Sequence, residues 1–312
     1  MDIDVLGLLA AAAGGFLGAT FGALIAFVFV GLAVLVGVAV LIGTGDASFL
    51  GSVAFGSFLG PHVSFAAGVG AVAYAARRGY HDSGRDVVTP LVSLARPDVL
   101  LVGAAFGVFG YLCQGIIAVV PWLGSHTDRI ALAVLVSALV ARLAFGRSGL
   151  VGANSLGHTG WRRFAPNDTQ AWLRYQERPA MVVLLGTFLG AVSASLAVTL
   201  LSAYPGATGV IYVGFAISAV SLAFLGVGVA MPVTHHITLV SAVAVAAVVA
   251  RWSLLPAPVL ILIGAGVGAI TALVCEGFSR LWLIRGDTHI DPPAAAIWPM
   301  TTLSLVVVEL LP

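Results

Sequence analysis

Two histidines recur at matching places in an otherwise apolar chain. His62 and His236 each open an apolar run, and each stands fifteen residues before an arginine, Arg77 or Arg251. Free backbone N–H groups and the helix dipole at such a helix start favour an anion or a carbonyl oxygen. We therefore expect the two starts to line a substrate or ion pathway, against the alternative of ordinary histidines near the membrane interface. The candidate residues at the two starts are His62, Ser64, His235, His236 and Thr238.

Glu276 is a carboxylate inside an apolar run, and Gln114 holds the matching place in the first half of the chain. A charged group in hydrocarbon is costly unless it faces a cavity. In such surroundings a carboxyl can exchange protons near neutral pH. Glu276 is therefore a candidate proton relay, with Gln114 as its polar counterpart. The alternative is an ion pair with Arg280, which lies one helical turn further along.

Three other polar positions interrupt the apolar pattern. Asp46 follows Gly-Thr-Gly, and either binds a cation or polar solute inside a broken helix or is a turn residue in a loop. His126 and His289 each stand two residues before an aspartate, Asp128 and Asp291. We expect the aspartates to be helix N-caps. The two histidines are candidates for the two mouths of one pathway.

The composition excludes a water-soluble globular protein. Of the 312 residues, 60% are hydrophobic and 9% are charged, and the mean hydropathy is +1.09, whereas soluble domains carry about 25% charged residues. The net charge of +1 gives no field that would attract nucleic acid. The two cysteines, Cys113 and Cys275, lie in apolar runs without metal-ligand spacing. The sequence carries no catalytic or phosphate-binding motif, so we expect no enzyme, no cofactor, no metal and no nucleic-acid partner.

The apolar runs predict an all-α integral membrane protein with about ten transmembrane helices. A span needs roughly 20 residues, so the first run, residues 5–43, is long enough for two. The N-terminus has no basic region, and we expect this run to be retained rather than cleaved as a signal peptide. The expected helices are residues 5–28, 31–55, 62–78, 97–121, 129–146, 180–202, 207–230, 235–251, 257–282 and 293–311.

The arginines test this number of helices, because cytoplasmic loops of membrane proteins carry an excess of cationic residues. All fourteen cationic residues are arginine. If residues 79–96 are cytoplasmic, alternation also places residues 147–179 and 283–292 inside. Twelve arginines then lie inside, and only Arg129 and Arg251 lie outside. We therefore expect a multi-pass protein of the cell membrane with both termini outside.

Matching strings in the two halves predict an internal duplication. The strings begin at Phe16, His62, Gly103, Leu112 and His126 and, in the same order, at Phe188, His236, Gly264, Val274 and His289. Each repeat holds five helices, an odd number, so the second enters the membrane from the opposite side as an inverted repeat. The alternative is a duplication that only enlarges the helix bundle. The expected division is a first repeat at residues 1–146, a cytoplasmic linker at 147–179 and a second repeat at 180–312.

The third helix of each repeat is short. Residues 62–78 and 235–251 would each span roughly 25 Å, less than the hydrocarbon core of about 30 Å. Short or interrupted helices at matching places mark the substrate site in transporters with inverted repeats. The segments before them, residues 48–60 and 220–232, are therefore candidate re-entrant or broken helices.

These patterns predict a permease that moves a small solute or ion by alternating access, with proton coupling as one option. A passive channel of the same plan is the first alternative. The second is a membrane scaffold or a membrane-embedded enzyme, since the linker at residues 147–179 is rich in arginine and tryptophan and is suited to docking a protein or lipid headgroups. The expected partners are a small molecule or ion, the lipid bilayer and, as an option, further copies of the chain.

Overall fold

The computed structural model describes residues 4–154, 157, 159–167, 169–252 and 254–312. Within these residues the chain forms helices and no β-strand. The first half contains α1 Val5–Phe21, α2 Ala23–Thr44, η1 Leu50–Ala54, α3 Ser64–Arg77, η2 Leu91–Leu94, α4 Pro97–Val119, α5 Leu123–His126 and α6 Arg129–Phe145. The second half contains η3 Gly160–Phe164, α7 Pro179–Ala203, η4 Thr208–Tyr212, α8 Val213–Ser221, α9 Ala223–Gly226, α10 His235–Arg251, α11 Ala257–Phe278, η5 Ser279–Leu283 and α12 Pro292–Leu310.

Six helical segments of the described chain are long enough and apolar enough to cross a membrane. They are Ala23–Thr44, Pro97–Val119, Pro179–Ala203, Thr208–Gly226, Ala257–Leu283 and Pro292–Leu310. The apolar helices Val5–Phe21 and His235–Arg251 are shorter. The chain therefore has the helices of an integral membrane protein, as its composition predicts.

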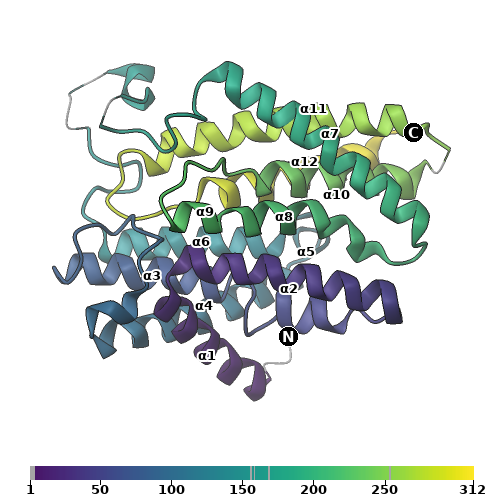
Figure 1. The fold of residues 1–312 in the computed structure, drawn as a ribbon. Coiled ribbons are helices and arrows are strands. Elements are labelled where there is room, and N and C mark those ends of the chain that lie inside the picture. Colours follow the sequence, from purple (N-terminus) through teal and green to yellow (C-terminus); the bar gives the residue numbers. More distant parts are fainter. Residues whose placement is uncertain (1–3, 155–156, 158, 168, 253) are drawn as a thin grey trace.

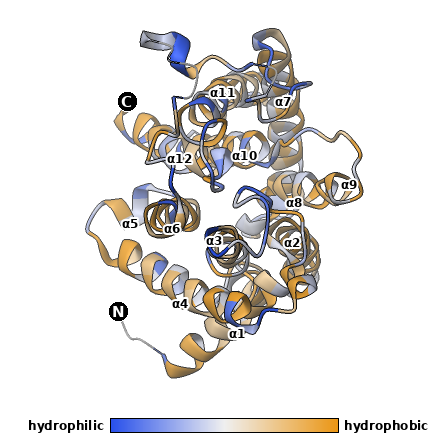
Figure 2. Ribbon diagram, turned by 90° about the vertical axis from the view of Figure 1, so that its left-hand side faces the viewer, coloured by the Kyte–Doolittle hydropathy of each residue, from blue (hydrophilic) through white to orange (hydrophobic). Residues whose placement is uncertain are grey.

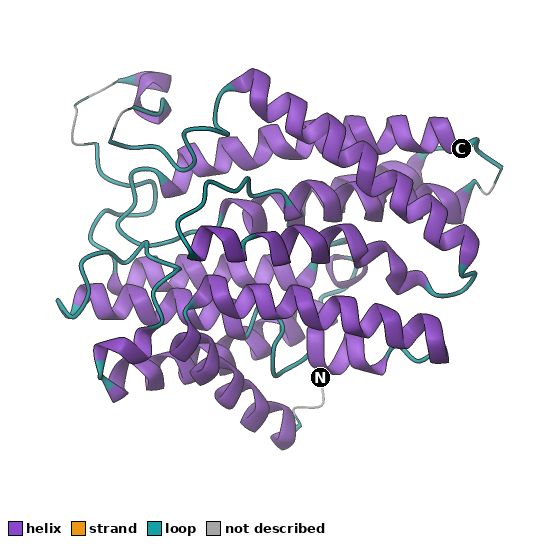
Figure 3. Cartoon of the chain, in the orientation of Figure 1, coloured by secondary structure: helices purple, strands orange, loops and turns teal. Residues whose placement is uncertain are grey.

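The helices run side by side and form two groups (Figure 1, Figure 3). In the first group α1 packs on α4 and α3, and in the second α7 packs on α11 and α10. Seen along the helices, the groups meet where α2 packs on α8 and α6 packs on α12 (Figure 2). Buried side chains from both groups share one apolar core, which includes Phe27, Val134, Phe215 and Ile297.

The long first apolar run divides at Gly22, so the predicted boundaries at residues 28, 31 and 55 are wrong. Gly22 has φ +84°, a left-handed value that favours glycine. A Cβ atom there would lie 2.8 Å from the Thr89 carbonyl oxygen, and the Leu24 amide donates to the Val87 carbonyl oxygen. The break thus follows from contact with a segment distant in sequence. The second helix ends at Gly45, which has φ +75°.

The segments before the two short helices differ from each other. In residues 48–60 the chain makes the single turn of η1 and then tight turns, with Leu50, Ala54 and Leu59 buried. Residues 220–232 instead contain the end of α8, the short α9 and an exposed coil. The short helices themselves begin in buried surroundings, since Ser64, Ile237 and the neighbouring residues are screened from solvent.

The polar loops gather at one end of the helices, which we call the arginine-rich end and define by residues 79–96, 147–179 and 283–291 (Figures 1 and 2). Gly84 pairs with Thr288 in an isolated β-bridge, and the Ala153 amide donates to the Arg285 carbonyl oxygen. At the opposite end the Trp252 indole donates to the carbonyl oxygen of Pro312 at 3.3 Å. Residues 283–291 therefore contact both of the other segments that the arginine count assigns to the same side.

Candidate functional site

A cavity of about 600 Å³ lies between the two helix groups. Its walls come from α2, α3 and α6 of the first group and from α8, α10 and α12 of the second. The lining also reaches both ends of the helices. It includes Val87 and Trp172 at the arginine-rich end, and Gly51 and Arg129 from segments at the other end.

Aromatic rings form the middle of the cavity. The Phe27 ring on α2 lies 5.7 Å from that of Phe65 and 5.8 Å from that of Phe215, measured between ring centroids. Two imidazoles flank this cluster. His235 lies 4.7 Å from Phe27, and His289 lies 6.1 Å from Phe65. Rings from both helix groups thus surround one space.

The polar groups of the cavity are few and come from both halves. His235, Gln114 and His289 line it, as the sequence analysis proposed for a pathway. His289 Nε2 lies 3.3 Å from Asp291 Oδ1. Among the described residues, no group bonds to the buried Nδ1 atom of His235. The cavity is therefore lined by an imidazole and by an imidazole–carboxylate pair, while the Nδ1 atom of His235 is itself buried.

Two aspartates in the lining are helix caps, which confirms that part of the sequence analysis. Asp128 Oδ1 accepts from the Ala131 amide, and Asp291 Oδ2 accepts from the Ala294 amide, each at 2.8 Å. Arg129 lies beside Asp128 in the lining. The sequence predicted that both aspartates cap helices. It gave no indication that they line a cavity, because a cap residue usually lies at the protein surface.

The matched histidines lie close to the cavity without lining it. His62 and His236 are 2% and 1% exposed, and neither Nδ1 atom has a bonding partner within the described part of the chain. Ser64 Oγ donates to the Leu59 carbonyl oxygen at 2.7 Å, and Thr238 Oγ1 donates to the His235 carbonyl oxygen at 3.2 Å. These hydroxyls are therefore occupied in holding the starts of α3 and α10.

Glu276 lies outside the cavity lining and pairs with Arg280, whose Nε atom is 2.6 Å from Glu276 Oε1. This is the geometry of the ion-pair alternative. Asp46 is exposed just beyond α2 and accepts from the Ser48 hydroxyl and amide, the geometry of a turn residue. The structure brings neither residue to the other candidates.

His126 lies at a surface. Its ring stacks on Trp122 with centroids 4.9 Å apart, and its Nε2 atom is 3.0 Å from Glu309 Oε2. His126 and His289 are therefore in unlike surroundings, although their sequences match.

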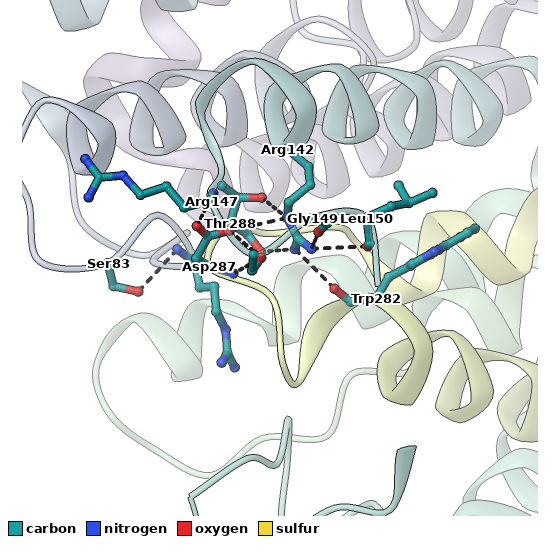
Figure 4. Close-up of polar contacts among 10 residues, drawn as sticks. Ser83, Arg142, Arg147, Gly149, Leu150, Trp282, Asp287 and Thr288 are labelled. Atoms are coloured by element: carbon teal, nitrogen blue, oxygen red, sulfur yellow. Dashed lines mark hydrogen bonds and ion pairs between the residues drawn. The ribbon is translucent and has the colours of Figure 1, made fainter. Parts of the chain in front are cut away.

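A second polar cluster ties the loops of the arginine-rich end together (Figure 4). Arg142 on α6 is 1% exposed and donates to the Thr288 side chain, to the Thr288 carbonyl oxygen at 2.7 Å and to the Trp282 carbonyl oxygen at 3.1 Å. Its Nε atom lies 3.7 Å from Asp287 Oδ1. Asp287 also accepts from the Ser148 hydroxyl. We call Arg142, Ser148, Trp282, Asp287 and Thr288 the Arg142 cluster.

Comparison with known proteins assigns the chain to a family. A family model described as "Family of unknown function (DUF7973)" matches residues 1–170 and residues 162–311. The chain belongs to this family. The two ranges of the DUF7973 match meet inside the polar segment 147–179. No curated protein and no solved structure matches the chain.

A search for metal ligands gives no candidate. In the described part of the DUF7973 chain, no group of three or more His, Cys, Asp or Glu side chains is placed to hold a metal ion.

Proposed function

We propose that this DUF7973 protein is a permease that moves a small solute or ion across a membrane through the cavity between its two helix groups. The observation that carries the proposal is the cavity itself, which is about 600 Å³ and is lined by both halves of the chain. Sites between two halves, beside short or broken helices, are typical of secondary transporters. Here His235, the first residue of α10, lines the cavity, and the buried start of α3 lies near it.

Matching contacts in the two halves support the proposed duplication. On α1 and α4, a Cβ atom at Gly15 would lie 2.7 Å from Gly107 Cα, and on α7 and α11 one at Gly190 would lie 3.0 Å from Gly268 Cα. Small residues let helices approach this closely. By these contacts Gly190 occupies the place in the second half that Gly15 occupies in the first. The matched strings instead align Gly190 with Gly18, which lies one helical turn after Gly15.

The link from the first helix to the third also recurs. A Cβ atom at Gly18 on α1 would meet the Ser64 carbonyl oxygen, and Ser193 on α7 donates to the Thr238 carbonyl oxygen at 2.6 Å. We infer that each helix of the first half has a counterpart in the second: α1 corresponds to α7, α2 to α8 and α9 together, α3 to α10, α4 to α11 and α6 to α12. Five helices in each half support a ten-helix inverted repeat, with the arginine-rich end on the cytoplasmic side.

The lining favours a small cation or amine-bearing solute over an anion. Asp128, Asp291 and Arg129 together bring two negative charges and one positive charge to the cavity. Aromatic faces, here those of Phe27 and Phe215 among others, attract cations.

A flux measurement tests the proposal and separates it from its alternatives. The full chain in liposomes is assayed with methylammonium, tetramethylammonium, chloride and glycerol. Saturable flux driven by a gradient supports a carrier. Non-saturating flux supports the channel, which the extension of the lining toward both ends favours. Absence of flux for all four solutes contradicts both.

Replacing Ala131 with phenylalanine should abolish most of the flux. Ala131 lines the cavity and is 5% exposed, so the added ring would fill space that the solute must cross. Leu143→Phe on the same helix is the matched control, because Leu143 is 71% exposed. The proposed route is wrong if the two variants transport alike.

Removing the charge of Asp291 should lower the flux of the cationic solutes, because the cavity loses one of its two carboxylates. Asparagine preserves the cap on α12, while the pair with His289 loses its carboxylate. The other titratable or charged groups of the cavity stay unchanged; they are His235, His289, Tyr212, Asp128 and Arg129. Glu276→Gln is the control, since Glu276 pairs with Arg280 outside the lining. Lower cation flux in Glu276→Gln with unchanged flux in Asp291→Asn would contradict the role given to Asp291 and restore Glu276 as the candidate.

A further inference from the structure

A second hollow, of about 370 Å³, opens at the arginine-rich end next to the Arg142 cluster. Its floor contains the buried residues Ala73, Gly286 and Thr288. Three arginines line it from three parts of the chain: Arg77 at the end of α3, Arg85 in the following loop and Arg147 just after α6. Cationic side chains distant in sequence thus converge on one space.

The guanidinium groups of these three arginines have no bonding partner in the described part of the chain. Among the described residues none of them makes a hydrogen bond or ion pair, although the backbone amides of Arg85 and Arg147 do. Burial lowers the pKa of the Arg85 guanidinium, which indicates that its charge lacks compensation. Arg85 is partly buried and would gain from an anion beside it, whereas Arg77 and Arg147 are exposed and line the hollow from the surface.

The acidic residues of the hollow do not supply that anion in full. Asp287 is engaged by Arg142, by the Ser148 hydroxyl and by the Arg147 amide. Asp82 is the other carboxylate in the lining. One free carboxylate therefore faces three free guanidinium groups, and the hollow keeps a net positive charge.

We propose that this hollow binds a phosphate group, carried by the headgroup of an anionic membrane lipid. Guanidinium groups bind phosphate through paired, charge-assisted hydrogen bonds. The hollow lies where α3 and α6 end, at the arginine-rich end that we propose to be on the cytoplasmic side of the membrane. Basic pockets between transmembrane helices bind phosphate headgroups in this position. The proposal does not depend on transport through the cavity between the helix groups.

A headgroup in this place would stabilise one conformation of the arginine-rich end. The hollow is formed by residues 77–85, by Arg147 and by residues 286–288, and a phosphate contacting all three parts would add to the bonds of the Arg142 cluster. Binding should therefore raise the thermal stability of the protein.

The test is lipid binding by the full chain in neutral detergent. Phosphatidylglycerol and phosphatidylcholine are titrated while the unfolding temperature and lipid adducts in native mass spectrometry are followed. We expect phosphatidylglycerol to bind and to raise the unfolding temperature, and phosphatidylcholine to do neither. Replacing both Arg77 and Arg147 with glutamine should weaken phosphatidylglycerol binding by roughly tenfold or more. Arg85→Gln is a second, independent variant.

The matched control removes two arginines of the same end that do not line the hollow, as Arg162→Gln with Arg174→Gln. Equal losses in the control and in the Arg77 and Arg147 variant would mean general attraction to the surface and would overturn the proposal, as would unchanged binding in all variants. Inorganic phosphate forms a further arm. If millimolar phosphate displaces the lipid from the unmodified chain, the result supports a phosphate-binding site that also accepts free inorganic phosphate. No displacement assigns the site to the lipid headgroup.

Discussion

Replacing Arg142 with glutamine is expected to destabilise the protein by about 1–3 kcal/mol, the cost typical of leaving a buried hydrogen-bonding group without its partner. The guanidinium donates to Thr288 and to the carbonyl oxygens of Trp282, Gly149 and Leu150. Glutamine is too short to reach these groups, so buried acceptors would lose their donors. The free energy of unfolding in detergent, measured with denaturant, checks this prediction.

Two further variants sharpen the measurement. Arg142→Lys keeps the charge but offers fewer donors in a different geometry, so we expect most of the loss to persist. Arg129→Gln is the control for losing an arginine from the same helix, since Arg129 is exposed at its first turn. An unfolding free energy for Arg142→Gln equal to that of Arg129→Gln would contradict the structural role given to Arg142.

The same cluster should make the stability of the protein depend on pH in acid. Partial burial raises the pKa of the Asp287 carboxyl, but hydrogen bonds from Ser148 and Arg147 and the charge of Arg142 outweigh it, and the net pKa lies below the usual value. The carboxylate therefore stabilises the fold at neutral pH. That stabilisation is lost as the pH falls below about 4 and the group takes up a proton.

Gly110→Ala is expected both to destabilise the protein and to abolish flux. A Cβ atom at Gly110 on α4 would collide with the carbonyl oxygen of His62, which is backbone and cannot rotate away. Overpacking of this kind costs typically 1–3 kcal/mol. The start of α3 would have to shift, and with it Ser64 and the Phe65 ring of the cavity. Unfolding and liposome flux measured on the same preparation check both parts.

The control is a glycine on the corresponding long helix of the second half. A Cβ atom at Gly266 on α11 would meet no atom within 4 Å. Gly266→Ala should therefore leave flux unchanged and raise stability by about 0.5–1 kcal/mol, the usual difference between alanine and glycine in a helix. Equal behaviour of the two variants would show that the contact between Gly110 and His62 has no importance.

The sequence predicted helix boundaries correctly where polar residues mark the ends of an apolar run. Residues 235–251 match α10, because His235 and Arg251 bound the apolar run. The division between α1 and α2 was misplaced, because residues 5–43 carry no charged residue and the break at Gly22 depends on contact with residues 87–89. Local patterns cannot report a contact of that kind.

The candidate site was predictable only in part, for a similar reason. His235, His289 and Gln114 were found because polar residues are rare in this chain. The aromatic cluster of Phe27, Phe65 and Phe215 was missed, since phenylalanine in an apolar helix usually signals packing. Glu276 stood out in the sequence, yet its partner Arg280 lies one turn away and occupies it.

The two ends of the molecule are held together by bonds of different kinds. At the arginine-rich end a buried guanidinium joins loops of both halves, whereas at the other end the halves are joined by uncharged bonds of Thr127 with Trp298 and Thr302 and by the surface pair of His126 with Glu309. Surface ion pairs contribute little to stability. For the permease that we propose, the resting equilibrium is therefore biased toward the conformation closed at the arginine-rich end. Weakening the Arg142 bonds is then expected to favour separation of these loops and to lower the stability of the protein.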